Sequence, residues 1–198
     1  DFNIWAYARI DTVKEKYLDT LKKAGVNWLA LGIESGNTTV RKDVVKGKFT
    51  EFNITDLVRQ VQDAGINVIG NYIFGLPEDN VETMQETLDL AKDLNCEFAN
   101  FYCTMAYPGS KLYLDAIAEN HTLPNTYSGW SQHSYDMIPL DTKHVDASEI
   151  VRFRDNAFND YHEDEKYLSM IEGKFGIETR NKMVDMCEYK LKRKLLGD

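Results

Sequence analysis

The sequence contains few cysteines, and their spacing excludes two common uses of this residue. Among 198 residues there are three, Cys96, Cys103 and Cys187. Three widely separated thiols can form neither a disulfide framework nor a zinc site of the usual spacing. Cys96 and Cys103 lie in one strand-like run at a separation that predicts opposite faces. We interpret all three as small buried hydrophobic residues in a reducing compartment, and we expect a cytoplasmic protein.

Long apolar runs and an excess of positive charge are also absent. No segment approaches the ~20 apolar residues that a membrane-spanning helix requires. The chain starts at Asp1 inside an apolar stretch, without the pattern of an export signal, and we expect a piece of a longer protein. Lys and Arg number 23 against 32 Asp and Glu, a net charge of −9. This balance argues against a nucleic-acid partner, whose phosphates need a basic face.

The basic cluster and the histidines can both be explained without a ligand. The basic cluster lies near the end of the chain, at Lys190, Lys192, Arg193 and Lys194. Cations in the last turn of a helix complement its dipole, so we predict a helix terminus there. The histidines follow no ligand spacing and are predicted to be loop residues, not metal ligands; they are His121, His133, His144 and His162.

Two similar segments indicate a repeated helix-to-strand unit. The sequence KAGVN at residues 23–27 precedes an apolar run at 28–33, and DAGIN at 63–67 precedes a second run at 68–74. In each unit a helical pattern ends at a glycine, which adopts the left-handed conformation at little cost. Further apolar segments from Asn3 to Ala8 and at 98–105 bring the predicted strands to four.

Amphipathic helices separate these strands. Capping boxes predict helix starts at Thr12 with Glu15, at Asp79 with Glu82, and at Asp146 with Glu149 in the tail. Apolar strands that alternate with helices indicate a parallel sheet covered on both faces. Right-handed crossovers then permit either a barrel-like or a doubly wound sheet. We predict an α/β core over residues 1–118 and a linker with a helical C-terminal extension over 119–198, including a last helix at about 178–196.

Polar residues and glycines follow each predicted strand. The segments are ARID at residues 8–11, GIESG at 32–36, IFGLPE at 73–78 and AYPGS at 106–110. Parallel α/β folds place their sites at the carboxyl ends of the strands. We therefore expect one polar rim at this edge of the sheet.

The order of these four motifs resembles the second half of a radical S-adenosylmethionine (SAM) core, over roughly residues 2–115. It is most similar to members that often carry an upstream cobalamin-binding domain. The resemblance implies a partial TIM-type (βα) barrel of six strands, truncated here to about four. It also implies a parent enzyme that uses SAM and a 4Fe-4S cluster, in some members with cobalamin, as an Fe-S oxidoreductase or radical methyltransferase. The CxxxCxxC loop that holds the cluster is not in this sequence, so we expect the chain alone to be inactive and to bind no cofactor.

The resemblance also implies roles for individual residues, none of them catalytic and none a metal ligand. Glu34 and Ser35 would face the ribose and methionine portion of SAM, and Arg9 would pair with the SAM carboxylate or with Glu34. Ile73 and Gly75 would lie against the adenine, and Glu78 would order that loop. Backbone groups of Ala106 and Tyr107 would contact the adenine edge. The family often has glycine where this sequence has Asn71, which is a departure from the pattern.

Simpler alternatives for the same residues stay open. Glu34 and Ser35 are also suited to capping a helix, and Arg9 with Asp11 to a surface ion pair. The chain could be a non-catalytic α/β binding module, or a hydrolase that uses Glu34 and Glu78 as opposed carboxylates. The substrate is expected to be a small molecule whose type the sequence does not indicate.

The first predicted strand has an unusual composition for the edge of a sheet. From Asn3 to Ala8 it is apolar and lacks the protective Lys or Pro of natural edge strands. We expect this strand to pair with a second copy of the chain, giving a dimer, or to be covered by the tail helices.

Overall fold

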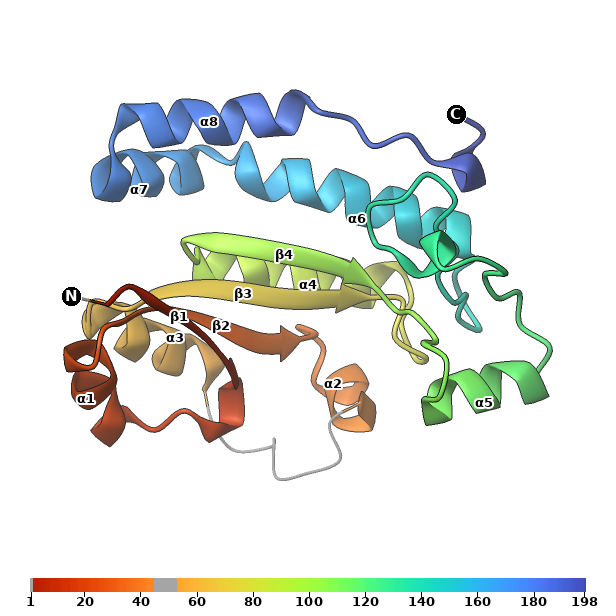
Figure 1. Ribbon diagram of the computed structural model, residues 1–198, viewed down its shortest axis with the longest axis horizontal. Coiled ribbons are helices and arrows are strands. Elements are labelled where there is room, and N and C mark those ends of the chain that lie inside the picture. Colours follow the sequence, from red (N-terminus) through yellow and green to blue (C-terminus); the bar gives the residue numbers. More distant parts are fainter. Residues whose placement is uncertain (1, 45–52) are drawn as a thin grey trace.

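The structure is a computed structural model that describes residues 2–44 and 53–198, and its centre is a parallel four-stranded sheet (Figure 1). The strands are β1 (Ile4–Arg9), β2 (Val26–Glu34), β3 (Asn67–Phe74) and β4 (Phe98–Cys103). Their order in the sheet is β1-β2-β3-β4, and every pair is parallel. A sheet that grows in one direction without reversal is the arrangement of a (βα) barrel. The predicted partial barrel is confirmed, and the four described strands show no reversal of order such as the centre of a doubly wound sheet has.

Eight α-helices lie within the described residues. They are α1 (Leu18–Lys23), α2 (Thr38–Val44), α3 (Ile54–Asp63), α4 (Val81–Leu94), α5 (Lys111–Ala118), α6 (Ala147–His162), α7 (Glu165–Phe175) and α8 (Ile177–Glu188). In Figure 1 the last three form a layer beside β4, at the side of the sheet away from β1. The helical extension is thus confirmed, although α2, α5 and α7 had no prediction of their own. No helix in residues 2–44 and 53–198 is both long and apolar enough to cross a membrane.

The repeated glycines perform the role expected of them. Gly25 and Gly65 both have positive φ, +96° and +76°, and each lies two residues after the end of its helix, α1 or α3. At Gly25 the requirement is also steric, because an added Cβ would lie 2.8 Å from the carbonyl oxygen of Phe2. Each glycine therefore turns the chain from a helix directly into the next strand.

Two of the three predicted capping boxes are wrong. Thr12 does not cap a helix; its hydroxyl donates to the carbonyl of Arg9, and α1 begins six residues later. The box before α4 lies one residue later than predicted, because Asn80 accepts from the amide of Thr83, whose hydroxyl accepts from the amide of Asn80. The cap at Asp146 is confirmed by its bond to the amide of Glu149.

The end of the chain also differs from the prediction. Helix α8 ends at Glu188, so the basic cluster is not the end of the last α-helix, and its Lys194 begins a short 3-10 helix over Lys194–Leu196. It lies on a segment that passes along α6, and Arg193 in this segment is 1% exposed. His162, predicted to be in a loop, is buried in α6. Contacts with α6, which are distant in sequence, override the local charge pattern in this region.

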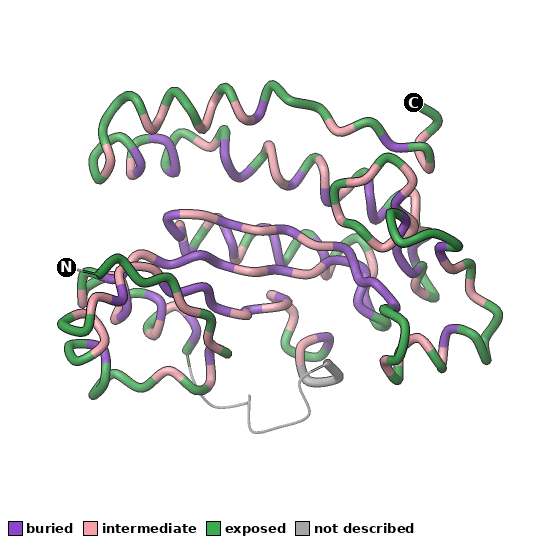
Figure 2. Tube along the Cα trace, in the orientation of Figure 1, coloured by how far each residue is buried: buried purple, intermediate pink, exposed green. Residues whose placement is uncertain are grey.

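Side chains from the tail close the outer edge of β4. Nε of Arg154 donates to the carbonyl of Phe101 at 2.7 Å. Gln132 bonds Cys103 twice, accepting from its amide at 3.0 Å and donating to its carbonyl at 2.9 Å. An edge strand whose backbone groups are bonded in this way cannot recruit another strand. In Figure 2 the trace of β4 alternates between buried and intermediate residues, and none of them is exposed.

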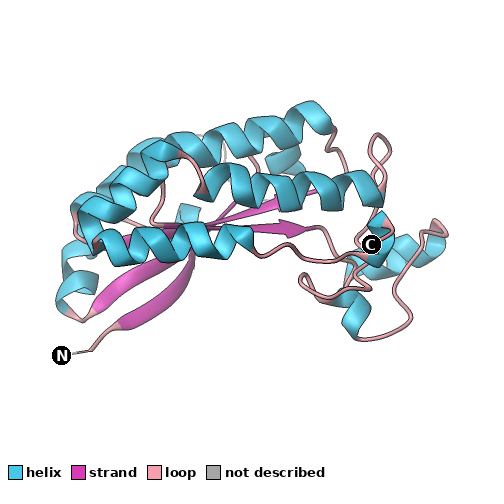
Figure 3. Cartoon of the chain, turned by 90° about the horizontal axis from the view of Figure 1, so that it is seen from above, coloured by secondary structure: helices cyan, strands magenta, loops and turns pink. Residues whose placement is uncertain are grey.

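The opposite edge of the sheet, at β1, is left open. Among the described residues β1 pairs with β2 alone, and Trp5 and Tyr7 are 55% and 75% exposed. Figure 3 shows the β1 end of the sheet projecting beyond the helices. The expectation that the tail covers β1 is therefore wrong, and pairing with a second copy stays a prediction.

Candidate functional site

The strand register places a row of polar groups across one face of the sheet. Arg9 is aligned with Gly32, Gly32 with Asn71, and Asn71 with Asn100. Aligned residues on neighbouring parallel strands point to the same face. Nδ2 of Asn100 donates to Oδ1 of Asn71 at 3.0 Å, and Nδ2 of Asn71 donates to the carbonyl of Leu31 at 3.3 Å. We call Arg9, Gly32, Asn71 and Asn100, with Glu34, the polar row.

Glu34 fills the space that Gly32 leaves in this row. The register shifts between Gly32 and Glu34, and Glu34 takes a left-handed φ of 70°, rare for a residue with a side chain. Its side chain folds back so that a Cβ added at Gly32 would lie 2.5 Å from Oε1. Burial raises the pKa of Glu34, and the Arg9 guanidinium partly opposes this rise. Local backbone strain of this kind is typical of functional sites.

Arg9 itself is held by its neighbour. Its Nε and Nη2 donate to the two carboxylate oxygens of Asp11 at 3.1 and 2.7 Å. The surface pair that we considered for these two residues is therefore present. The guanidinium also lowers the pKa of Glu34 through its charge, while the pairing of Arg9 with Glu34 or with the SAM carboxylate stays a prediction.

Ser35 lies next to Glu34 but points into the protein. Its hydroxyl is fully buried, 3.2 Å from Oγ1 of Thr87 on α4, and accepts from the amide of Asn37. Gly36 packs so closely on the same helix that a Cβ would lie 2.4 Å from the carbonyl oxygen of Glu86. In the GIESG motif, Gly32 and Glu34 thus contribute to the polar row, whereas Ser35 and Gly36 attach the strand end to α4.

The end of β3 and the loop after it contain one residue on the face of the polar row, and a glycine that packs against α6. Ile73 is half-buried and lies on the face of Asn71, two residues away. Gly75 has a φ of +76°, and an added Cβ would lie 2.8 Å from Cδ1 of Ile150 on α6. It lines a cavity of about 280 Å³ that Glu34, Ile73 and Tyr107 do not line. The four residues therefore share the carboxyl edge of the sheet without forming that cavity together.

Asp79, which sequence reasoning did not single out as a site residue, orders this loop. Its buried carboxylate accepts from the amide of Leu76 at 2.9 Å and from Oγ1 of Thr83 at 2.7 Å. Burial raises the pKa of Asp79, and these bonds oppose the rise. Glu78, the residue expected to order the loop, is exposed and bonds Nζ of Lys143 at 2.9 Å, which lowers its pKa. The only sequence signal for Asp79 was the predicted capping box with Glu82, which lies one residue before the observed cap at Asn80.

The backbone after β4 is largely occupied by the protein's own bonds. Nε1 of Trp130 donates to the carbonyl of Ala106 at 2.9 Å. The amide of Tyr107 donates to the carbonyl of Met105, and its carbonyl accepts from the amide and hydroxyl of Ser110. The Ala106 carbonyl keeps one lone pair for another donor, whereas the Tyr107 amide and carbonyl are already engaged in these bonds. The Tyr107 side chain, half of which is exposed, is free of this restriction.

The cysteines are not arranged to hold an iron–sulfur cluster. All three are buried free thiols, and burial raises the pKa of Cys96 and of Cys103 to about 12. Cluster ligands are thiolates, which these pKa values disfavour. In the described part of the chain there is also no group of three or more His, Cys, Asp and Glu side chains placed to bind a metal.

Comparison with known proteins places these features in a wider context. Residues 7–91 match the sequence profile of the Radical SAM superfamily. An uncharacterized methyltransferase of Pyrococcus horikoshii is 27% identical over 82% of this chain and 34% of its own length. A putative methylthiotransferase of Methanocaldococcus jannaschii is 33% identical over 50% of this chain and 22% of its own length. The chain thus spans about a third of the first relative and about a fifth of the second.

One solved structure with detectable similarity is TsrM from Kitasatospora setae, described as a radical S-adenosylmethionine methyltransferase with cobalamin and a [4Fe-4S] cluster bound. Its sequence is 24% identical, the match covers 50% of this chain and 20% of TsrM, and the TM-score is 0.46.

Proposed function

We propose that the chain forms the SAM-facing second half of a radical SAM enzyme, because residues 7–91 match the profile of the Radical SAM superfamily. The observation that supports the proposal is the polar row, which lies on one face of the sheet near the carboxyl ends of its strands. Parallel α/β folds bind their ligands at this edge. A reaction of the methyltransferase or Fe-S oxidoreductase type is proposed because two relatives are described as a methyltransferase and a methylthiotransferase.

The residues of the polar row fit parts of SAM. The Gly32 gap lets the Glu34 carboxylate lie close to the sheet, where it can accept hydrogen bonds from ribose hydroxyls or the methionine ammonium group. Asn71 and Asn100 add fixed amide groups to the same face. The half-buried Ile73 offers an apolar surface for the adenine ring. In this arrangement the chain orients the ligand and excludes water, which is the usual contribution of a protein to cofactor chemistry.

The described residues do not fit the 4Fe-4S cluster. In the whole enzyme the cluster would supply the reducing electron for SAM cleavage, and residues outside those described here would hold it. In the proposed parent protein its three thiolates come from a CxxxCxxC segment preceding Asp1. We propose that this chain alone is inactive. Binding of a small-molecule substrate, and of cobalamin if the parent uses it, would also need other parts of the parent.

Titration with S-adenosylhomocysteine, which is chemically close to SAM, tests the SAM site without the cluster. Amide resonances of Gly32, Glu34, Asn71 and Ile73 are expected to shift together, with a dissociation constant in the millimolar range because the cluster contacts are missing. Gly32→Val should abolish the shifts by filling the gap. Gly173→Val is the control, because a Cβ at Gly173 meets nothing within 4 Å. Shifts confined to other residues, or equal shifts in Gly32→Val, would contradict the proposal.

Anaerobic incubation with iron and sulfide tests the assignment of the cluster. The chain is expected to stay colourless, whereas a longer form that includes the CxxxCxxC segment should turn brown and cleave SAM. A stoichiometric cluster on the chain alone would show that thiols of this chain bind iron, against the structure. A parent gene without the cysteine motif would instead favour a non-catalytic binding module.

A further inference from the structure

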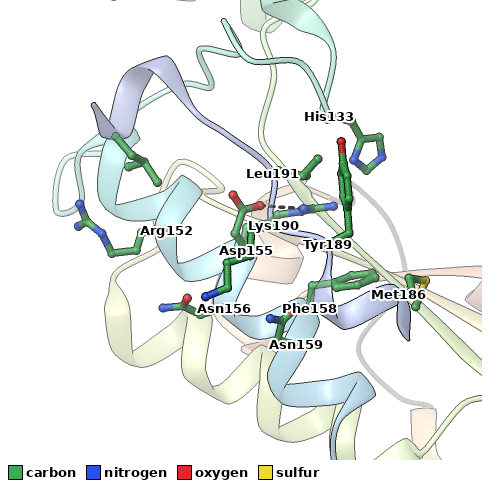
Figure 4. Close-up of a pocket in the computed structure, with 12 residues that line it drawn as sticks. His133, Arg152, Asp155, Asn156, Phe158, Asn159, Met186, Tyr189, Lys190 and Leu191 are labelled. Carbon is green, nitrogen blue, oxygen red and sulfur yellow. Dashed lines mark hydrogen bonds and ion pairs between the residues drawn. The ribbon is translucent and has the colours of Figure 1, made fainter. Parts of the chain in front are cut away.

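A second candidate binding site lies in the C-terminal extension, between α6, the end of α8 and the segment at residues 189–196. The pocket there has a volume of about 490 Å³, within the range of small-molecule sites. Figure 4 shows Tyr189 beside His133 on one side, with Phe158 and Met186 below them. None of these residues belongs to the polar row, so the pocket needs a separate explanation.

The charged residues that line the pocket are mainly cations. They are Arg152, Arg154 and Lys190, against the single carboxylate of Asp155. This local excess of positive charge occurs in a protein whose net charge is −9. A concave site with one sign of charge concentrates ligands of the opposite sign.

Within residues 2–44 and 53–198, the ion pairs at the base of the pocket join two guanidinium groups to one carboxylate. Arg154 is 4% exposed, and its Nη1 donates to Oδ1 of Asp155 at 2.8 Å. The same carboxylate accepts from Nε and Nη2 of Arg193, both at 2.9 Å. Two buried guanidinium groups thus share one carboxylate, which leaves a net charge of +1. A buried charge without a full counter-charge is costly, and an anion in the pocket would relieve that cost.

The wall formed by residues 189–196 is fixed in place before any ligand arrives. Nη1 of Arg193 donates to the carbonyls of Gln132 and Ser134, both at 3.0 Å. The amide of Lys194 donates to the carbonyl of Tyr135 at 2.8 Å. A preformed wall lowers the entropic cost of binding, because less of the protein has to become ordered.

The remaining lining of the pocket is apolar or aromatic. Phe158 packs under the Arg154 guanidinium, with the ring centroid 5.7 Å from Cζ. Met186, Tyr189, Leu191 and Leu196 complete this part of the surface. A ligand that is anionic throughout would leave these groups without contacts. The pocket therefore fits a molecule with an anionic group at one end and an apolar body at the other.

We propose that this pocket binds a small molecule with an aromatic or branched aliphatic body and a carboxylate or phosphate group. The anionic group contacts Arg154 and Lys190, and the body lies on Phe158 and Leu191. Arg152 at the rim attracts the anion. This inference rests on the extension alone and is independent of the proposed SAM site.

Titration of the ¹⁵N-labelled chain with phenyl phosphate, phenylacetate and benzyl alcohol tests the proposal. At least one of the two anions is expected to shift resonances of Tyr189, Leu191 and Arg193 saturably, and their relative affinities show which anionic group the site prefers. Benzyl alcohol should bind at least about tenfold more weakly, since it lacks the charge-assisted bonds. Equal binding of the alcohol, or no saturable shift with either anion, would overturn the proposal.

Charge variants localise the binding. Arg152→Gln with Lys190→Gln should weaken anion binding about tenfold or more, while leaving the fold intact, because both side chains are exposed. Lys182→Gln with Lys192→Gln removes the same charge from exposed positions that do not line the pocket. Equal losses in both double variants would show non-specific attraction and contradict the site.

The ring of His133 supplies an independent readout. Burial and the nearby cations Arg154 and Arg193 lower the pKa of His133, while Asp155 opposes them. An anion bound beside these groups should raise this pKa, and the imidazole proton resonances follow it directly. A pKa that does not move when the anion saturates would place the anion elsewhere.

Discussion

The carboxylate of Glu34 lies so close to Gly32 that a single methyl group at Gly32 would come within 2.5 Å of Oε1. The two residues are separated by one position in β2, and the register shift between them turns the Glu34 side chain back along its own strand. Because Gly32 has no side chain, the carboxylate of Glu34 can be partly buried in the polar row. This contact is the most specific feature of the proposed SAM site.

Gly32→Ala should displace the Glu34 carboxylate toward solvent. Because burial is the main cause of its raised pKa, the pKa should fall toward the ordinary value for glutamate. Side-chain carboxyl ¹³C resonances followed through a pH titration report this directly. Gly173→Ala in α7, where an added Cβ has no neighbour within 4 Å, is the control and should leave the pKa unchanged. An unchanged pKa in Gly32→Ala would show that the two groups do not compete for space.

Arg193→Met should be strongly destabilising because it removes two charge-assisted bonds to Asp155 and leaves the carbonyls of Gln132 and Ser134 without this buried donor. Removing one partner of a buried pair costs about 3 kcal/mol or more, measured as the free energy of unfolding in urea. Lys23→Met removes an exposed ion pair with Asp19 and should cost well under about 1 kcal/mol. Similar losses for the two variants would mean that the buried pair contributes no more than a surface one.

The same pair predicts a dependence of stability on pH. Burial alone would raise the pKa of Asp155, but bonds from Arg193 and Arg154 outweigh it and lower the pKa. The folded protein therefore holds this proton less tightly than the unfolded chain does. The stabilisation is complete above the ordinary aspartate pKa of about 4 and is lost as the pH falls through the lowered value. The difference in unfolding free energy between wild type and Asp155→Asn should shrink over that acidic range.

Asn80→Ala tests the corrected start of α4. It removes the bond to the amide of Thr83 and should cost about 1 kcal/mol of stability. Glu82→Ala removes the glutamate of the box predicted from sequence and should have a much smaller effect, since the Thr83 hydroxyl occupies the reciprocal position. If Glu82→Ala were the more destabilising change, the helix would begin one residue earlier.

The open edge at β1 predicts self-association. Sedimentation should show a concentration-dependent dimer, which Trp5→Lys with Tyr7→Lys disrupts, because charge on an edge strand opposes pairing. Tyr127→Lys changes an aromatic residue that is at least as exposed but lies outside the sheet, and it should leave association unchanged. A chain that remains monomeric at high concentration would contradict pairing through β1.

The alternation of strands and helices could be predicted from sequence because it depends on local patterns. Apolar runs such as residues 68–74 and the glycines at 25 and 65 act over a few residues, and the structure confirms both. The four strand-end motifs, taken in order, were likewise sufficient to indicate the radical SAM family. The position of Glu34 at the carboxyl edge followed from parallel strands alone, whereas Asn71 was singled out only through the family resemblance.

Contacts between distant parts of the chain decided the rest. Only the register shows that Arg9, Gly32, Asn71 and Asn100 form one row, because a shift of one residue would send these side chains to the other face. The burial of Ser35 against Thr87 and the bond from Trp130 to Ala106 join residues 52 and 24 positions apart. Arg193 looked like a cation of a helix terminus and is instead bonded to Asp155, 38 residues away. Periodicity cannot predict such partners, since each bond depends on where the folded chain brings two segments together.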